Sequence, residues 1–104
     1  MTKVVFYEKD ENLIGYLIKD HSGYDEEGYD IVCASVSSAA YLTANTLTEI
    51  VGAKADIDVR EAYFRFIVTD KLGESENHLK GLKLHLESLA QDYNEYITCK
   101  TETV

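Results

Sequence analysis

Hydrophobic residues gather in five short runs that are typical of β-strands. The first two runs, residues 4–7 and 13–19, are separated by a charged turn and predict a hairpin. Three further runs cover residues 55–59, 62–69 and 96–100, and aromatic side chains are concentrated in the second of these. Together they predict a sheet of about five strands.

Two longer stretches between these runs repeat hydrophobic residues at helical spacing. The first begins at Asp30, a residue type that often caps helices, and ends at Gly52. Its predicted apolar face consists of Val32, Val36, Ala39, Ala40, Thr43, Leu47 and Ile50. The second stretch begins at Ser75, which is expected to cap it. Its apolar stripe consists of Leu79, Leu82, Leu86, Leu89 and Tyr93.

The elements therefore follow the order β-β-α-β-β-α-β. This order predicts an α+β fold, in which a small mixed sheet of about five strands carries two main helices on one face. A length of 104 residues fits one domain, so we expect a single domain over residues 1–104. A hydrophobic content of 45% argues against a disordered chain.

The chain carries 19 acidic and 10 basic residues, which gives a formal net charge of −9. Phosphate binding needs clustered Lys and Arg, so this balance argues against nucleic acid and favours a basic partner. No apolar run approaches the roughly 20 residues that span a bilayer, and the first residues show no signal-peptide pattern. We therefore expect a cytoplasmic protein without a membrane partner, in which Cys33 and Cys99 stay reduced and unbridged.

Candidate chemistry centres on Cys33, which falls in the first turn of the first predicted helix. The partial positive charge and unpaired N–H groups of a helix N-terminus stabilise a thiolate. His21 ends the second predicted strand, and a Gly-containing acidic loop could return the chain so that imidazole and thiol meet. That pair is the minimal arrangement of a cysteine hydrolase. On spacing alone, a small buried cysteine is the commoner interpretation.

Asp30 fits two roles that the sequence leaves open. It could cap the helix through its own hydrogen bonds, or it could orient His21 as the third member of a triad. The two remaining histidines, His78 and His85, lie seven residues apart on the second predicted helix and could bind a metal. No acidic or cysteine ligand sits at a matching spacing, so we predict neither a metal site nor another cofactor.

The segment 21–37 resembles the signature of the ribosomal-processing cysteine protease family, Prp. That family has a Gly-His-Ala-Gly-Tyr run, a short loop, and then Asp-Ile-Val-Cys-Ala-Ala-Val-Ser. The matching residues are His21, Gly23, Tyr24, Gly28, Asp30, Ile31, Val32, Cys33, Ala34, Val36 and Ser37. The chain departs from the pattern at Asp20, which replaces a glycine, and at Ser22 and Ser35, which each replace an alanine.

The resemblance implies a cysteine endopeptidase that removes a short N-terminal extension from a large-subunit ribosomal protein, after an aromatic-containing apolar segment. It implies that Cys33 is the nucleophile, His21 its base and Asp30 the supporting acid, with Gly23 as the pivot of the loop. It also implies a homodimer. A basic ribosomal substrate would suit the acidic chain.

Two further expectations concern how a peptide is held. Tyr24 and Tyr29 flank the acidic loop and could pack on the apolar residues before the cut. Backbone N–H groups near Cys33 and Ala34 are expected to be free to stabilise the oxyanion. The alternative function is a noncatalytic, ribosome-associated binding module on the same fold, in which Cys33 only packs and its thiol alkylates slowly.

Overall fold

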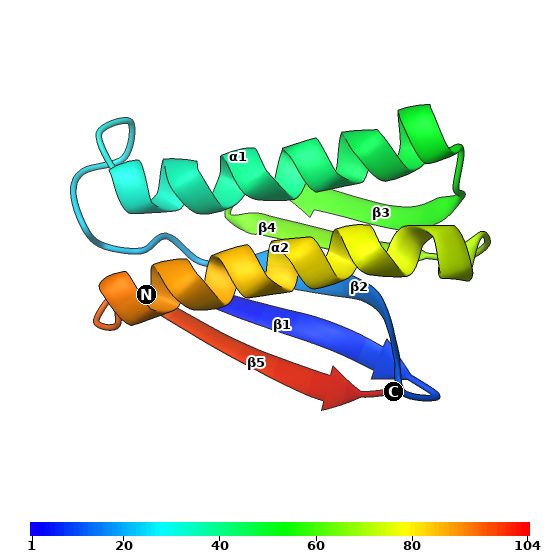
Figure 1. The fold of residues 1–104 in the computed structure, drawn as a ribbon. Coiled ribbons are helices and arrows are strands. Elements are labelled where there is room, and N and C mark those ends of the chain that lie inside the picture. Colours follow the sequence, from blue (N-terminus) through cyan, green and yellow to red (C-terminus); the bar gives the residue numbers. More distant parts are fainter.

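One five-stranded sheet carries two long helices on the same face in the computed structural model, which describes residues 1–104 (Figure 1). The strands are β1 (Thr2–Lys9), β2 (Asn12–Lys19), β3 (Ala55–Arg60), β4 (Tyr63–Val68) and β5 (Ile97–Thr103). The helices are α1 (Ile31–Asn45), which continues into a π-helical segment η1 (Thr46–Val51), and α2 (Leu72–Asp92). The predicted α+β fold and its element order are confirmed.

The strand order is β3-β4-β2-β1-β5, in which only the β1–β5 pair is parallel and the other pairs are antiparallel. Lys19 at the end of β2 pairs with Lys3 of β1 and with Tyr63 of β4. The chain therefore leaves β2 beside the start of both neighbouring strands. The loop 20–30 then crosses to the first turn of α1, so this end of the sheet and the N-terminus of α1 lie together (Figure 1).

The core lies between the sheet and the two helices. Tyr16 of β2 sits at its centre with no exposed surface, and its ring packs against Phe64 and Phe66 at centroid distances of 5.7 and 5.5 Å. Its hydroxyl donates a 2.8 Å hydrogen bond to the backbone oxygen of Ala40, which ties α1 to the sheet. Burial raises the pKa of Tyr16 far above its usual range, so this donor stays protonated.

The start of α2 differs from the prediction. The helix begins at Leu72, directly after Lys71, whose backbone has a left-handed φ of 48°. Ser75 does not cap the helix, because its hydroxyl lies inside the first turns and donates a 2.8 Å bond to the oxygen of Lys71. The preceding segment is held elsewhere: Asp70 accepts a 2.7 Å bond from the N–H of Lys54. A tertiary contact thus lets the helix begin without a side-chain cap.

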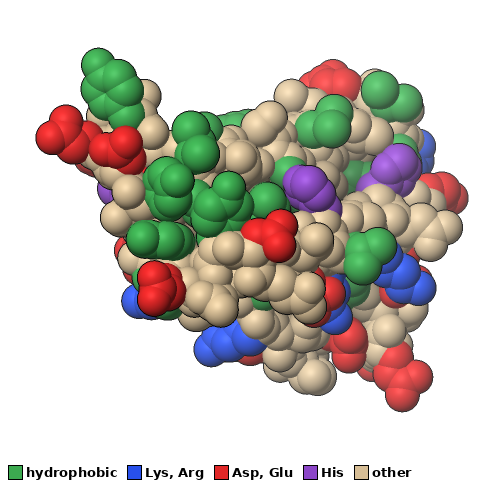
Figure 2. All heavy atoms as spheres, turned by 60° about the vertical axis from the view of Figure 1, so that its left-hand side comes forward, with side chains coloured by type: hydrophobic (Ala, Val, Ile, Leu, Met, Phe, Trp, Pro, Cys, Tyr) green, Lys and Arg blue, Asp and Glu red, His purple; other side chains and the backbone are tan.

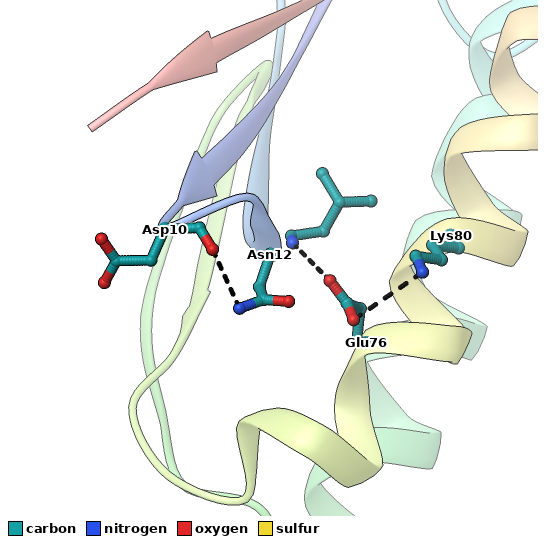
Figure 3. Close-up of polar contacts among 5 residues, drawn as sticks. Asp10, Asn12, Glu76 and Lys80 are labelled. Atoms are coloured by element: carbon teal, nitrogen blue, oxygen red, sulfur yellow. Dashed lines mark hydrogen bonds and ion pairs between the residues drawn. The ribbon is translucent and has the colours of Figure 1, made fainter.

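A second contact ties the first turns of α2 to the β1–β2 hairpin (Figure 3). The carboxylate of Glu76 accepts a 3.0 Å hydrogen bond from the N–H of Leu13 and lies 3.7 Å from the ammonium of Lys80. Asn12 donates a 3.2 Å bond to the oxygen of Asp10 within the turn itself. The end of α2 opposite the loop 20–30 is therefore anchored to the sheet.

Three hydrophobic residues of the predicted helix and strand segments are exposed, including Ile50 of the predicted apolar helix face. Ile50 of η1 is 81% exposed, and Ile57 and Val59 of β3 are 52% and 51% exposed. Ile50 precedes Gly52, whose φ of 77° ends the helix, and β3 is an edge strand with a neighbour on one side only. No helix of the structure combines the length and the apolar character needed to cross a membrane.

Candidate active site

His21 and Cys33 lie together at the junction of β2 and α1. The sulfur of Cys33 is 3.8 Å from Nδ1 of His21, a residue 12 positions earlier in the chain. The His21 ring is exposed, and Cys33 is partly buried. The loop 20–30 therefore returns the chain as the sequence suggested, and it brings an imidazole within hydrogen-bond reach of a thiol at a helix N-terminus.

The chain bends sharply between β2 and His21. Asp20 makes this bend with a φ of 69°, the left-handed region that glycine adopts without strain. Its N–H donates a 2.9 Å bond to the oxygen of Ala62, and its own oxygen accepts a 3.0 Å bond from the hydroxyl of Thr2. The carboxylate also lies 3.3 Å from the ammonium of Lys3. These contacts hold a conformation that the glycine of the family signature would reach freely.

Asp30 is the N-cap of α1 and is only 8% exposed. One carboxylate oxygen accepts a 2.9 Å bond from the N–H of Cys33, and the other accepts a bond from the hydroxyl of Ser22. Burial alone would raise the pKa of Asp30. The bonds from Cys33 and Ser22, with smaller contributions from the backbone N–H groups of Tyr24 and Asp25, outweigh burial and hold the pKa below its usual value.

Of the two roles that the sequence left open for Asp30, the structure displays the cap. Both of its oxygens are engaged with the helix start and with Ser22, and neither is hydrogen-bonded to His21. The cap places Cys33 at the third position of the helix, where the sequence predicted it. Asp30 therefore bears on the thiol–imidazole pair through the backbone.

The expectation about free oxyanion donors is wrong for two residues. The N–H of Cys33 is bonded to the Asp30 carboxylate, and the N–H of Ala34 donates a 3.0 Å bond to the Asp30 backbone oxygen. A hydropathy pattern does not show which backbone N–H group a capping side chain will occupy. Ile31 and Val32 are the first-turn residues whose N–H groups have no partner in the structure.

The two tyrosines of the loop occupy different environments. The ring of Tyr24 packs edge-on against Tyr93 and Tyr96 near the end of α2, at centroid distances of 5.8 and 5.2 Å. Tyr24 therefore anchors the loop to the domain while remaining 41% exposed. Tyr29 is 73% exposed, and Gly23 makes a left-handed turn with a φ of 77°. Figure 2 shows exposed hydrophobic side chains gathered beside acidic ones on this part of the surface.

A pocket of about 150 Å³ adjoins His21 and Cys33. Its wall is aromatic, with Tyr41, Tyr63 and Phe64 among the lining residues. The rings of Tyr41 and Phe64 stack at 4.8 Å, and the guanidinium carbon of Arg60 lies 4.1 Å from the centroid of the Tyr63 ring. The sequence did not reveal this pocket, because its residues come from α1 and from four different strands, β1 to β4. The aromatic content of β4 was the only signal for it.

Two acidic side chains lie close to the imidazole of His21. A ring nitrogen of His21 and one carboxylate oxygen each of Glu27 and Glu61 all lie within 4.8 Å of one another. All three residues are exposed. These are the residues that could hold a cation, and the sequence did not bring them together. His78 and His85, which the sequence offered instead, line a groove between α1 and α2 with Asn77 and without an acidic or thiol partner.

The family model described as Cysteine protease Prp matches residues 1–98. The chain belongs to the Prp family of cysteine proteases. This membership confirms the resemblance seen in segment 21–37 and the prediction that the chain is an enzyme that hydrolyses peptide bonds.

Relatives and a solved structure agree with the Prp assignment. The chain is 22% identical over 102 residues to the ribosomal processing cysteine protease Prp of Bacillus subtilis, a match that covers 91% of each chain. It is 28% identical over 92 residues to Prp of Staphylococcus aureus, covering 85% of this chain and 87% of the relative. A crystal structure of S. aureus Prp with a covalently linked product peptide superposes with a TM-score of 0.91 at 24% identity, covering 98% of this chain and 100% of that one.

The second thiol of this Prp-family chain lies outside the site. Cys99 of β5 is partly buried, and burial together with the nearby Glu87 carboxylate raises its pKa to about 11, with Lys83 acting in the opposite direction. Such a thiol is protonated at neutral pH and reacts slowly. The two cysteines therefore differ in surroundings, with Cys99 packed against the core.

Proposed function

We propose that this Prp-family protease removes a short N-terminal extension from a basic large-subunit ribosomal protein, with Cys33 as nucleophile and His21 as general base. The observation that carries the proposal is the 3.8 Å separation of the Cys33 sulfur and His21 Nδ1 at the N-terminus of α1. The names of the B. subtilis and S. aureus relatives support the ribosomal substrate.

The reaction follows from this geometry in two steps. His21 accepts the thiol proton, and the Cys33 sulfur attacks the scissile carbonyl to form a tetrahedral oxyanion. The unpaired N–H groups of Ile31 and Val32 and the positive end of α1 are the available stabilisers for that charge. His21 then returns the proton to the leaving amine, and water attacks the thioester with His21 again as base.

The surroundings of the pair suit a peptide that is apolar before the cut and basic after it. The aromatic pocket beside Cys33 offers Tyr41 and Tyr63 to an apolar or aromatic side chain. A second hollow on the far side of the pair includes Asp25 and Glu27 among its lining residues. Exposed charges of this kind attract a basic chain and act mainly on the rate of encounter. Tyr29 is free to contact the peptide, whereas Tyr24 serves to anchor the loop.

The experiment that tests the function is incubation with a basic large-subunit ribosomal protein that carries its N-terminal extension, followed by measurement of product mass. We expect loss of a short N-terminal piece with the wild-type chain and no cleavage with Cys33→Ala. The Cys99→Ala variant is the matched control and should cleave normally. Cleavage by Cys33→Ala at the wild-type rate would exclude Cys33 as the nucleophile. Homodimerisation stays a prediction, which the molar mass in solution tests.

A further inference from the structure

Ser22 occupies a position that the mechanism above does not use. Its side chain is 2% exposed, and its hydroxyl donates a hydrogen bond to the Asp30 carboxylate while accepting a 3.2 Å bond from the N–H of Tyr24. The family signature has an alanine here, which offers no hydroxyl. The bond from Ser22 is therefore a feature of this chain that membership in the family does not account for.

We propose that Ser22 is a positioning residue, whose bond to Asp30 fixes the His21 imidazole relative to the Cys33 thiol. This inference rests on the proposed function, in which His21 is the base. Ser22 directly follows His21 in the chain, and the same Asp30 carboxylate binds the N–H of Cys33. One carboxylate thus joins the segment that bears the base to the turn that bears the nucleophile.

The contacts close a ring through four residues. It runs along the chain from His21 to Ser22, across the hydroxyl–carboxylate bond to Asp30, across a 2.9 Å bond to the N–H of Cys33, and back from the sulfur to His21 over 3.8 Å. Adjacent Cα atoms are only about 3.8 Å apart, so a shift of Ser22 moves the His21 backbone almost as far. The separation of base and thiol therefore depends on the Ser22 bond.

The other side of His21 is fixed independently. Asp20, the residue before it, is bonded to the Ala62 oxygen and to the Thr2 hydroxyl, both at the start of the neighbouring strands. His21 is thus bracketed between a residue held by the sheet and a residue held by the helix cap. Its own ring is exposed and is hydrogen-bonded to the thiol of Cys33, with the carboxylates of Glu27 and Glu61 nearby. The backbone on both sides of His21 is thus held by hydrogen bonds of its chain neighbours.

Loss of the hydroxyl has a definite consequence at this site. The Ser22→Ala variant removes the hydroxyl that donates to the Asp30 carboxylate, which then keeps only backbone N–H donors from Cys33 and the loop. The segment 21–24 then loses both hydroxyl bonds while the cap bond to Cys33 remains. We therefore expect the imidazole to drift from the thiol, with Cys33 itself staying in place.

The test compares Ser22→Ala with the wild-type chain in two assays. In the first, kcat and KM are measured on the ribosomal substrate; in the second, Cys33 is alkylated by iodoacetamide at neutral pH in a Cys99→Ala background. We expect kcat and the alkylation rate each to fall about tenfold, with KM changed less than about twofold. Ser35→Ala is the matched control, because its hydroxyl bonds only Ile31 in the same helix. It should match the wild-type chain in both assays.

A nearly isosteric pair isolates the hydroxyl if the alanine variant folds poorly. Ser22→Thr keeps the donor and should retain kcat within about threefold, whereas Ser22→Val should lose about tenfold at an equal melting temperature. Equal kcat and equal alkylation for the Thr and Val variants would overturn the proposal. The alkylation assay needs no substrate. A wild-type chain that fails to cleave the ribosomal protein would therefore refute the proposed function and still leave the role of Ser22 decided by alkylation.

Discussion

The sulfur of Cys33 and Nδ1 of His21 lie 3.8 Å apart because a helix cap and a strand end meet at one edge of the fold. Cys33 is set by Asp30, which caps α1, and His21 by the bend that Asp20 makes after β2. Neither the helix cap nor the strand end positions both residues by itself. The four predictions that follow examine what each part of this arrangement contributes.

Replacement of the base should slow chemistry more than binding. A positioned general base contributes about 10²–10⁴-fold to a proton-transfer step, so His21→Ala is expected to lower kcat by that order. KM should change little, because His21 is placed to act on the thiol and not to grip the peptide. Steady-state kinetics on the ribosomal substrate measure both constants. A variant with unchanged kcat and a raised KM would instead assign His21 to substrate binding.

The two thiols should react at very different rates. With a pKa of about 11, Cys99 is thiolate in roughly one molecule in a thousand at pH 8, and its alkylation should rise about tenfold per pH unit up to that pKa. Cys33, at the helix N-terminus and beside His21, should be alkylated first. Mass spectrometry of peptides after a timed iodoacetamide pulse compares the two sites. Equal labelling at neutral pH would contradict the surroundings described for Cys99.

Loss of the charge on the helix cap should destabilise the fold in a pH-dependent way. The folded-state pKa of Asp30 lies below its unfolded value of about 3.9, so the ionised form stabilises the native state at pH above about 4, and this stabilisation is lost as pH falls through the folded pKa. Asp30→Asn keeps a capping oxygen but removes the negative charge at the positive end of α1, so it should cost about 0.3–1 kcal/mol at pH 7.

Urea denaturation of both chains across the acid range measures this effect. The difference in unfolding free energy between wild type and Asp30→Asn should shrink as the pH drops below about 4. The control is Asp92→Asn, an exposed position at the end of α2, which should track the wild type. A gap that stays constant to the lowest pH would show that the charge of Asp30 does not contribute.

The aromatic pocket should select the residue before the cut. Removing the Tyr41 ring opens the wall that stacks on Phe64, so Tyr41→Ala is expected to lower kcat/KM about tenfold for a peptide with an aromatic residue there. A peptide with alanine at the same position should lose far less. Tyr7→Ala, at a tyrosine of β1 outside the pocket, is the control. An equal loss on both peptides would remove the pocket from substrate selection.

Periodicity and capping chemistry in the sequence determined most of the architecture. The helix that starts after Asp30 and stops at Gly52 and the stripe of leucines on α2 are local patterns, and the structure reproduces them. The position of Cys33 in the first turn is likewise local, since it follows from the spacing to its cap. The start of α2 was predicted three residues late, because the contacts that hold Lys71 and Asp70 come from distant segments.

Only the tertiary structure decided how the parts of the site meet. Sequence spacing could name His21, Asp30 and Cys33 but could not tell whether Asp30 faces the imidazole or the helix. The answer depends on Ser22, whose buried hydroxyl takes the second carboxylate oxygen. The aromatic pocket is likewise invisible in the chain, because Tyr41 and Tyr63 become neighbours only when α1 packs on β4. Local patterns fix helices and strands through short-range hydrogen bonds, whereas partners far apart in the chain are chosen by packing.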